Sequence, residues 1–164
     1  MNSRISEHLN RELNLQINKE FYSSYLYLAM TDYFNKEHLY GFAHWCKKQS
    51  EEELSHGMSV FEFLNELNGN IEFMQILQPQ TNFQSPIETL KAIVMHEEHI
   101  TQSLKEITVM AKEENAFAIM SFLKDMLNEQ HEEEKNAFKI YSKYKLFGEN
   151  KAALYLLDKE LSER

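Results

Sequence analysis

Four long stretches of this sequence repeat apolar residues at alternating spacings of three and four, which keeps the side chains on one face of an α-helix. The stretches run from about Ser3 to Glu37, Leu39 to Asn68, Ser85 to Glu114 and Ala116 to Phe147. Only 4 glycines and 2 prolines interrupt the 164 residues, which favours long helices over many short strands. A shorter helical pattern follows at Lys151 to Leu161.

The connection between the second and third stretches determines the topology. Short links join the first stretch to the second and the third to the fourth, so each pair must be antiparallel. Residues Gly69 to Gln84 contain Pro79 and no helical period, and such an extended segment reaches roughly 50 Å. A helix of about 28 residues is roughly 42 Å long. The segment can therefore cross the whole bundle and leave the second and third helices parallel.

The predicted fold class is all-α: a four-helix bundle with one long crossover between helices two and three, plus a short C-terminal fifth helix. We expect a single domain over residues 1–164, with the bundle at about 3–147 and the fifth helix at about 150–161. A flexible hinge between two independent hairpins is the alternative, but neither half would bury enough surface to be stable alone.

Each apolar stripe is interrupted near its middle by a carboxylate. The interrupting residues are Glu20, then Glu53 with His56, then Glu97, and finally Gln130 with Glu133. From Glu20 to Glu53 is 33 residues, and from Glu97 to Gln130 is also 33. The two helical pairs thus carry their polar residues in equivalent places, as an approximate internal two-fold would require. A charged run is ordinarily a solvated helix face, but four coincident interruptions need a specific cause.

Buried carboxylates are costly because each loses its hydration and like charges repel one another. A multivalent cation held between them removes both costs. Oxygen ligands with one imidazole suit iron, manganese or zinc, and the lack of thiolates argues against copper(I) or an iron–sulfur cluster. Shared carboxylates would bridge two metal ions, which is the arrangement that two-electron oxygen chemistry needs.

The composition excludes several classes of partner. The formal net charge of −9 disfavours nucleic acid and favours a cationic ligand. Cys46 stands alone, so we expect no disulfide within the chain and a reducing, cytoplasmic compartment. The first residues lack the apolar region of a signal peptide, and no run of about 18 apolar residues is present. We therefore expect a soluble protein without a membrane partner.

Four segments resemble the bacterial non-haem ferritins: NKEFYSSYLY around Glu20, EEELSH on the second helix, HEEHITQ on the third and LNEQHEEE on the fourth. The similarity extends over essentially the whole chain, including the crossover and the fifth helix. The second helix has Glu53-x-x-His56, whereas the fourth has Gln130-x-x-Glu133. This asymmetry resembles the ferritins and differs from bacterioferritins and di-iron oxygenases, which use a second Glu-x-x-His.

The resemblance implies two adjacent iron positions and a third nearby. The first position would be held by Glu20, Glu53 and His56. Glu53 would bridge to the second position, which is completed by Glu97 and Glu133, with Gln130 nearby. Tyr27 matches the family's tyrosine beside the centre. The third position, on the inner surface, would be formed by Glu52, Glu129 and Glu132, and shared with Glu133.

The resemblance also implies a function: oxidation of Fe(II) by O2 or H2O2 and storage of Fe(III) as a mineral. It implies a shell of twenty-four subunits, with the fifth helix packing at the four-fold axes. Haem is not expected, because Leu54 follows Glu53 where bacterioferritins have methionine. Met120 and Leu123 stand where animal-type ferritins place the carboxylates of their three-fold channels, so the resemblance does not extend to that acidic funnel.

Two other classes of function remain open. One is a soluble di-iron enzyme that acts on organic substrates or peroxide without storing iron. The other is a purely structural helical module whose glutamates bind nothing. A miniature ferritin that shields DNA is disfavoured, since such sites lie between subunits and this chain has no basic tail.

Overall fold

The computed structural model describes residues 5–163, which form five helices and no strand. The helices are α1 (Glu7–Lys36), α2 (Tyr40–Glu66), α3 (Pro86–Glu113), α4 (Phe117–Phe147) and α5 (Lys151–Ser162). This confirms the predicted all-α class with its short C-terminal helix. The expected start of the first helix at about Ser3 lies outside the described residues. Within residues 5–163, no helix is long and apolar enough to cross a membrane.

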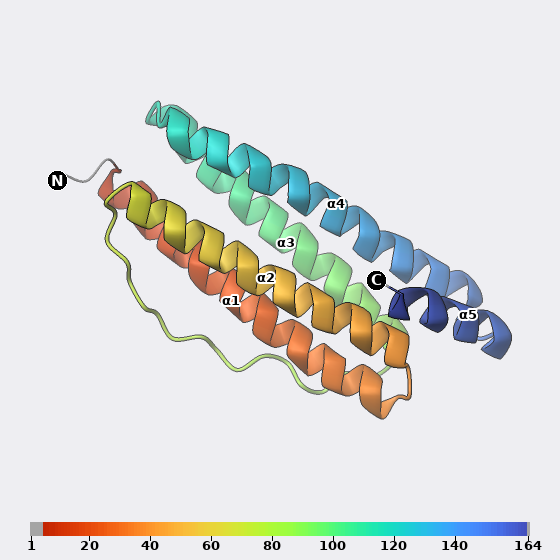
Figure 1. Cartoon of the computed structure of the whole chain (residues 1–164). Helices are drawn as coiled ribbons and strands as arrows, with labels where there is room; N and C mark the ends of the chain where they lie inside the picture. Colours follow the sequence, from red (N-terminus) through yellow and green to blue (C-terminus); the bar gives the residue numbers. More distant parts are fainter. Residues whose placement is uncertain (1–4, 164) are drawn as a thin grey trace.

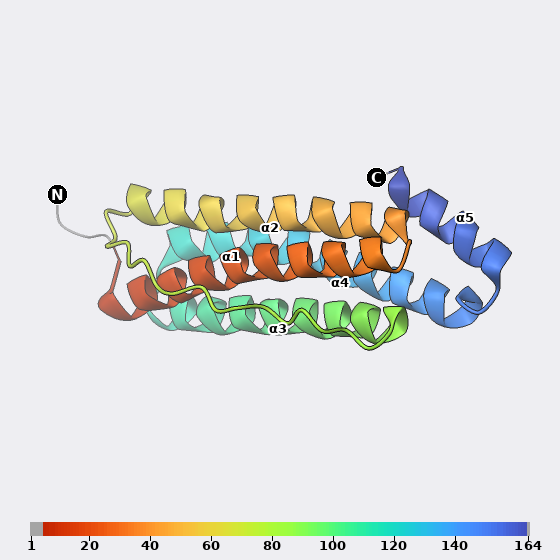
Figure 2. The same cartoon turned by 90° about the horizontal axis from the view of Figure 1, so that it is seen from below.

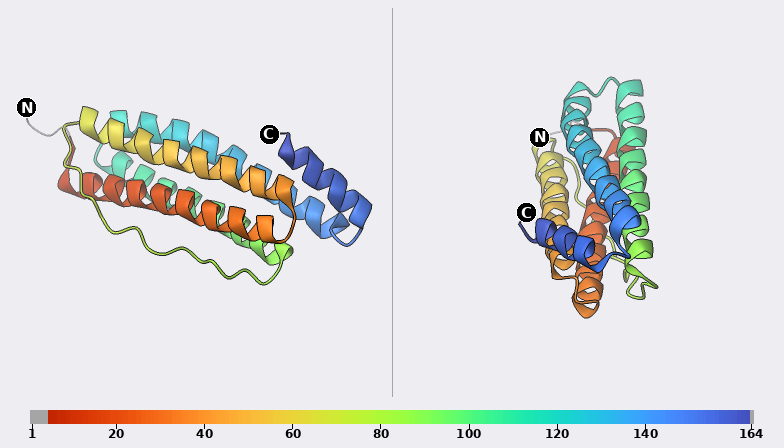
Figure 3. Two further views of the ribbon diagram at one scale, coloured as in Figure 1. Left: turned by 60° about the horizontal axis from the view of Figure 1, so that its bottom comes forward. Right: turned by 90° about the vertical axis from the view of Figure 1, so that its right-hand side faces the viewer.

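The four long helices lie side by side as two antiparallel pairs, α1 with α2 and α3 with α4 (Figure 1). The segment between α2 and α3 runs the length of the bundle along the outside of α1 and α3 (Figure 2). As predicted, this crossover makes α2 and α3 parallel. The short helix α5 lies across one end of the bundle, where it packs on α2 and α4 (Figure 3).

The crossover is held to α1 by three asparagines spaced four residues apart, Asn10, Asn14 and Asn18. The amide of Asn14 donates to the Asn70 carbonyl at 2.8 Å and accepts from the Glu72 N–H at 2.8 Å. Asn10 bonds both the N–H and the carbonyl of Asn70, and Asn18 reaches carbonyls further along. An extended segment outside any sheet needs partners for its backbone groups, and this row of side chains supplies them.

Replacing Asn14 by alanine should loosen the crossover. Asn14 is 1% exposed, and its loss removes hydrogen bonds to the backbone on both sides of Ile71. We expect the free energy of unfolding to fall by about 1 to 3 kcal/mol and limited proteolysis to cut within residues 70–80 more rapidly. Asn65→Ala is the matched control, because Asn65 is exposed and bonds only within α2 in the described structure. Equal protease sensitivity of the two variants would contradict this role.

The ends of the helices follow signals in the sequence. Ser85 accepts a hydrogen bond from the Glu88 N–H, with Pro86 at the first helical position, as the stretch SPIE predicts. At Asn68 the backbone enters the left-handed region with φ 52°, which ends α2. His38 and Asn115 do the same after α1 and α3. Asparagine tolerates this conformation better than most residues.

The start of α2 is capped from α5 rather than by its own sequence. Leu39, at the N-cap position, makes no side-chain cap. Instead the Oδ1 atom of Asp158 accepts from the N–H groups of Gly41 and Phe42 at 2.8 and 3.0 Å. A Cβ atom on Gly41 would lie 1.6 Å from the Asp158 carbonyl oxygen. The missing side chain is therefore what lets α5 approach α2.

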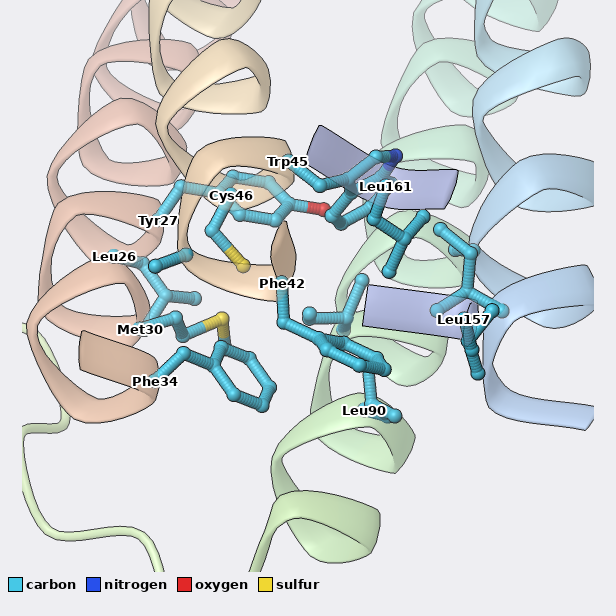
Figure 4. Packing of buried hydrophobic residues seen from close by; sticks show 14 residues of the cluster. Leu26, Tyr27, Met30, Phe34, Phe42, Trp45, Cys46, Leu90, Leu157 and Leu161 are labelled. Carbon is cyan, nitrogen blue, oxygen red and sulfur yellow. The ribbon is translucent and has the colours of Figure 1, made fainter. Parts of the chain in front are cut away.

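Two apolar clusters fill the interior of the bundle, one on each side of its middle. The first cluster contains Tyr27, Phe34, Phe42 and Trp45 and extends to Leu157 and Leu161 of α5 (Figure 4). The second contains residues from the other end of each long helix, such as Leu13, Leu64, Leu104 and Leu123. On every long helix, the interrupting polar residues lie between the two clusters.

The alternation of three and four that defines the apolar stripes predicts Phe63, Val94 and Phe122 as core positions, and each prediction is wrong by one residue. Phe63, Val94 and Phe122 are only partly buried, and the buried residues are instead Leu64, Ile93 and Leu123. At about 100° per residue, a step of three ends about 60° short of a full turn and a step of four about 40° beyond it, so either of two adjacent residues can face the core. Leu123 faces the core, while Met120 is partly buried.

Candidate metal centre

The four long helices bring five of the predicted site residues into two overlapping groups. Ligand atoms of Glu20, Glu53 and His56 all lie within 4.8 Å of one another. The same holds for Glu53, Glu97 and Glu133. Glu53 belongs to both groups and joins them. Each residue comes from the middle of its helix, because the 33-residue spacing places the interruptions at one depth.

These carboxylates lie in the interior with oxygens that the protein leaves unpartnered. Glu20, Glu53 and Glu97 are each 1% exposed. Within residues 5–163, no hydrogen-bond partner is found for either oxygen of Glu53, for Oε2 of Glu20 or for Oε2 of Glu133. A buried oxygen without a donor is costly. The unpartnered oxygens from three helices belong to the two groups, and a cation is the partner that would satisfy them.

Glu97 is held differently from the other glutamates. The Tyr27 hydroxyl donates to its Oε1 atom, and the Gln130 amide donates to Oε2 at 2.6 Å. Tyr27 is itself buried, and burial together with the Glu97 charge raises the pKa of its hydroxyl well above the ordinary value. Tyr27 therefore stays a neutral donor. Tyr27 and Gln130, both predicted to lie beside the centre, fix the orientation of Glu97.

Burial favours the protonated form of every carboxyl group in the cluster. It raises the pKa of Glu97 to about 7, against the opposing hydrogen bonds from Tyr27 and Gln130. Burial and the charges of Glu97 and Glu20 raise the pKa of Glu133 to about 8. Burial also raises the pKa of Glu20 and, with the surrounding carboxylates, that of Glu53 well above the ordinary value. The metal-free cluster thus retains protons near neutral pH.

His56 lies at the edge of the cluster, with its side chain 16% exposed. Its Nδ1 atom is 3.7 Å from Oε2 of Glu53. Its Nε2 atom is 3.3 Å from Oε2 of Glu129 and 3.9 Å from Oε1 of Glu133. The imidazole therefore separates the buried carboxylates from an exposed glutamate on α4.

The residues predicted for a third iron position are not gathered in the same way. Glu129 lies beside His56, but its side chain is 66% exposed. Glu132 is 61% exposed and pairs with Lys135 at 3.3 Å, while Glu52 is half-buried. Among residues 5–163, these glutamates form no group with ligand atoms as close as those of the two buried groups.

Sequence reasoning assigned no role to several residues that support the site. Gln16 donates to Oε1 of Glu20 at 2.6 Å, and Gln49 hydrogen-bonds Glu133, which opposes the rise that burial causes in the Glu133 pKa. Both are buried and lie one helical turn before a predicted ligand, which is the signal that would have found them. Gly57 lets α1 approach α2 here, since a Cβ atom would lie 2.5 Å from the Phe21 ring.

Replacing Tyr27 by phenylalanine should destabilise the metal-free protein in a pH-dependent way. The hydroxyl donates to a buried carboxylate, so its loss should cost about 2 kcal/mol where Glu97 is ionised. Below the Glu97 pKa of about 7 the carboxyl group is protonated, and the cost should shrink. Denaturant unfolding at several pH values measures this. Tyr155→Phe, on an exposed tyrosine of α5, should show neither effect, and a pH-independent loss in Tyr27→Phe would contradict the assignment.

The fold and the buried ligands define a class: four-helix bundles that carry a cluster of carboxylates and histidine in the core. The donor set of hard oxygens and one imidazole suits iron, manganese or zinc, and the unpartnered oxygens suit two adjacent ions. Residues 10–147 match the ferritin family, described as a ferritin-like domain. The chain therefore belongs to the ferritin family.

Relatives and solved structures agree with this membership. The chain is 34% identical over 161 residues to the bacterial non-heme ferritin of Staphylococcus aureus (strain USA300), covering 98% of this chain and 96% of that protein. It is 35% identical over 160 residues to the corresponding protein of Bacteroides fragilis (strain 638R), covering 98% and 99%. The open pore ferritin of the archaeon Archaeoglobus fulgidus superposes with a TM-score of 0.96 at 42% identity, covering 98% of both chains. A humanized archaeal ferritin gives a TM-score of 0.95 at 43% identity, with 98% of both chains covered.

Proposed function

We propose that this protein oxidises Fe(II) at the paired positions and stores the Fe(III) as a ferric mineral inside a shell of its own copies. The observation that carries the proposal is Glu53, buried between two ligand groups with both oxygens unpartnered in the described structure. A single carboxylate placed in this way can bridge two ions. The bacterial non-heme ferritins that the chain resembles support the same function.

Iron is the substrate in this proposal, and the residues bind it and release it. Glu20, Glu53 and His56 hold one Fe(II), while Glu53, Glu97 and Glu133 hold the other. Glu97 and Glu133 lose their protons as the ions bind, because a metal ligand must be deprotonated. Hard carboxylate oxygens stabilise Fe(III) more than Fe(II), which favours oxidation. Two Fe(II) ions give up one electron each, and O2 takes up these two electrons and two protons to become H2O2. When H2O2 is the oxidant, it takes up two electrons and two protons and becomes two water molecules.

Of the glutamates predicted for a third iron position, Glu129 is the best placed to receive iron that leaves the pair. It lies beside His56 at the exposed edge of the cluster. We propose that Glu129, with Glu52 and Glu132, forms this third position after their side chains rotate, and that the position shares Glu133 with the pair. The side chains of Glu129 and Glu132 are exposed, so they can rotate at little cost in free energy.

Storage requires an enclosed volume that one bundle does not have, and we propose that twenty-four copies supply it. Exposed apolar side chains on two faces support association between copies. Tyr25 and Leu28 of α1 lie with Ile76 of the crossover along one face, and Tyr155 and Leu156 of α5 are exposed at one end. Contiguous exposed apolar surface is typical of protein interfaces. We propose that α5 packs at the four-fold axes.

Aerobic addition of Fe(II), followed by size-exclusion chromatography, tests the proposal. We expect on the order of hundreds of irons per assembly to elute with a very large protein peak, as storage in a shell requires. Iron that precipitates away from the protein would contradict storage. A soluble di-iron enzyme predicts a small discrete oligomer by light scattering, and a structural module predicts no metal binding by calorimetry.

A further inference from the structure

A continuous row of hydrogen bonds connects a lysine near the surface to the buried carboxylate of Glu20. Lys19 Nζ donates to Ser103 Oγ at 2.6 Å. Ser103 Oγ in turn donates to Gln16 Oε1 at 2.6 Å. Gln16 Nε2 completes the row by donating to Glu20 Oε1, also at 2.6 Å. We call Lys19, Ser103 and Gln16 together the Lys19 relay.

The two ends of the relay determine the direction of every bond within it. An ammonium group can only donate, and the carboxylate of Glu20, which must be ionised to bind a metal ion, can only accept. Because Lys19 donates to Ser103, the hydroxyl proton of Ser103 is free to point at Gln16 Oε1. The amide nitrogen of Gln16 then faces Glu20. Hydrogen bonds that all run one way strengthen one another, so the relay is matched to an ionised Glu20.

The relay occupies one oxygen of Glu20 and leaves the other. Oε1 accepts from Gln16, whereas Oε2 has no hydrogen-bond partner among the described residues. Gln16 and Ser103 are almost fully buried, at 0% and 4% exposed, so the arrangement has little freedom to rotate. Its position is set by the packing of α1 against α3.

No equivalent relay supports the matching glutamate of the second position within residues 5–163. An offset of 77 residues relates Glu20 to Glu97 and relates Gln16 to Ile93. Isoleucine has no side-chain donor. Both oxygens of Glu97 are instead bonded to Tyr27 and Gln130. The two metal positions are therefore prepared in different ways.

We propose that Gln16, Ser103 and Lys19 are positioning residues, which fix the Glu20 carboxylate so that its Oε2 atom is presented to the metal ion shared with Glu53 and His56. This inference rests on the proposed function. It predicts that damage to the relay weakens the ion held by Glu20 and leaves the ion held by Glu97 and Glu133 nearly unchanged. Tyr27→Phe should do the reverse, because Tyr27 orients Glu97.

Calorimetric titration of the whole assembly with Co(II) alone, followed also by the visible absorption of Co(II), tests the proposal. Lys19→Met keeps the aliphatic stem and removes the donor, and Ser103→Ala breaks the relay in its middle. Each should weaken one of two bound ions per subunit by about tenfold, as is typical when a group supporting a ligand is lost. The absorption bands of that ion should also shift. Lys19→Arg retains a cationic donor and should keep the Co(II) affinity and the absorption bands of the wild-type protein.

Lys105→Met is the matched control, because it removes the same charge from an exposed residue of α3. It should leave the Co(II) affinities and spectra of the wild-type protein unchanged. If the wild type binds two Co(II) ions and both relay variants keep its affinities and spectra, the relay is refuted while the proposed function stands. Equal weakening of both ions, or an equal effect of Lys105→Met, also refutes it. If the wild type binds no Co(II), the proposed function fails, and the inference fails with it.

Discussion

Replacing Glu53 by glutamine should remove fast Fe(II) oxidation and at the same time make the metal-free protein more stable. Glu53 belongs to both ligand groups, so its loss affects both ions. Loss of a group that supports a metal ligand typically lowers metal affinity or activity about 10- to 100-fold. Loss of this shared ligand should therefore lower the rate of Fe(II) oxidation roughly 100-fold or more. The rate of Fe(II) oxidation under air, followed by absorbance, measures the first effect.

The expected gain in stability has a different cause. Burial and the charges of Glu97, Glu20 and Glu133 raise the pKa of Glu53 well above its ordinary value, so its ionised form is strongly disfavoured in the fold. Glutamine has nearly the same shape, carries no charge and can donate to a neighbouring carboxylate. We expect the free energy of unfolding without metal to rise by on the order of 2 kcal/mol near neutral pH.

Glu51→Gln is the matched control for Glu53→Gln. Glu51 lies in the same run of three glutamates, but its side chain is 52% exposed and pairs with Lys48. The same change of charge at this position should alter neither oxidation nor stability by a measurable amount. Oxidation at the wild-type rate in Glu53→Gln would contradict the bridging role. Loss of both activity and stability would show that the variant is merely misfolded.

The stability of the metal-free protein should fall as the pH rises from about 5 to about 8. Burial raises the pKa of Glu97 to about 7 and that of Glu133 to about 8, against an ordinary value of 4.5. Between these limits the folded chain holds more protons than the unfolded chain, so raising the pH favours unfolding. At about 1.4 kcal/mol per pKa unit, the loss across the window is on the order of 5 kcal/mol.

Divalent metal should reverse this pH dependence. Metal ions displace the protons that the carboxyl groups retain, so their affinity should increase about tenfold per pH unit for each proton released. Calorimetry with Zn(II) in buffers of different ionisation enthalpy counts these protons. We expect at least one proton per subunit to be released near pH 7. A metal-free stability that is flat or rises over the same window would contradict the protonated cluster.

Much of the fold follows from local sequence. The helical period, the scarcity of glycine and proline, and the cap at Ser85 predicted the four helices to within a few residues. The length of the stretch from Gly69 to Gln84 predicted the crossover. What local sequence did not predict is how the crossover is held, because its backbone bonds to asparagines of α1 that lie 56 to 60 residues away.

The core positions near Leu64, Ile93 and Leu123 were each misplaced by one residue. Steps of three and of four residues both return close to the same side of a helix, so the periodicity alone does not decide which of two adjacent apolar residues faces the core. Farther along the same stripes, Leu67, Leu90 and Ile119 are buried as expected. Packing against the neighbouring helices makes the choice.

The sequence by itself determined which side chains share a helix face and at what depth four carboxylates meet, because helical periodicity is a local property of the chain. Only the tertiary structure decided how each carboxylate is held. Gln16 meets Ser103 across 87 residues, and Tyr27 meets Glu97 across 70. Such contacts depend on how the helices rotate and pack against one another. That packing leaves both oxygens of Glu53 unpartnered within the described chain and occupies both oxygens of Glu97.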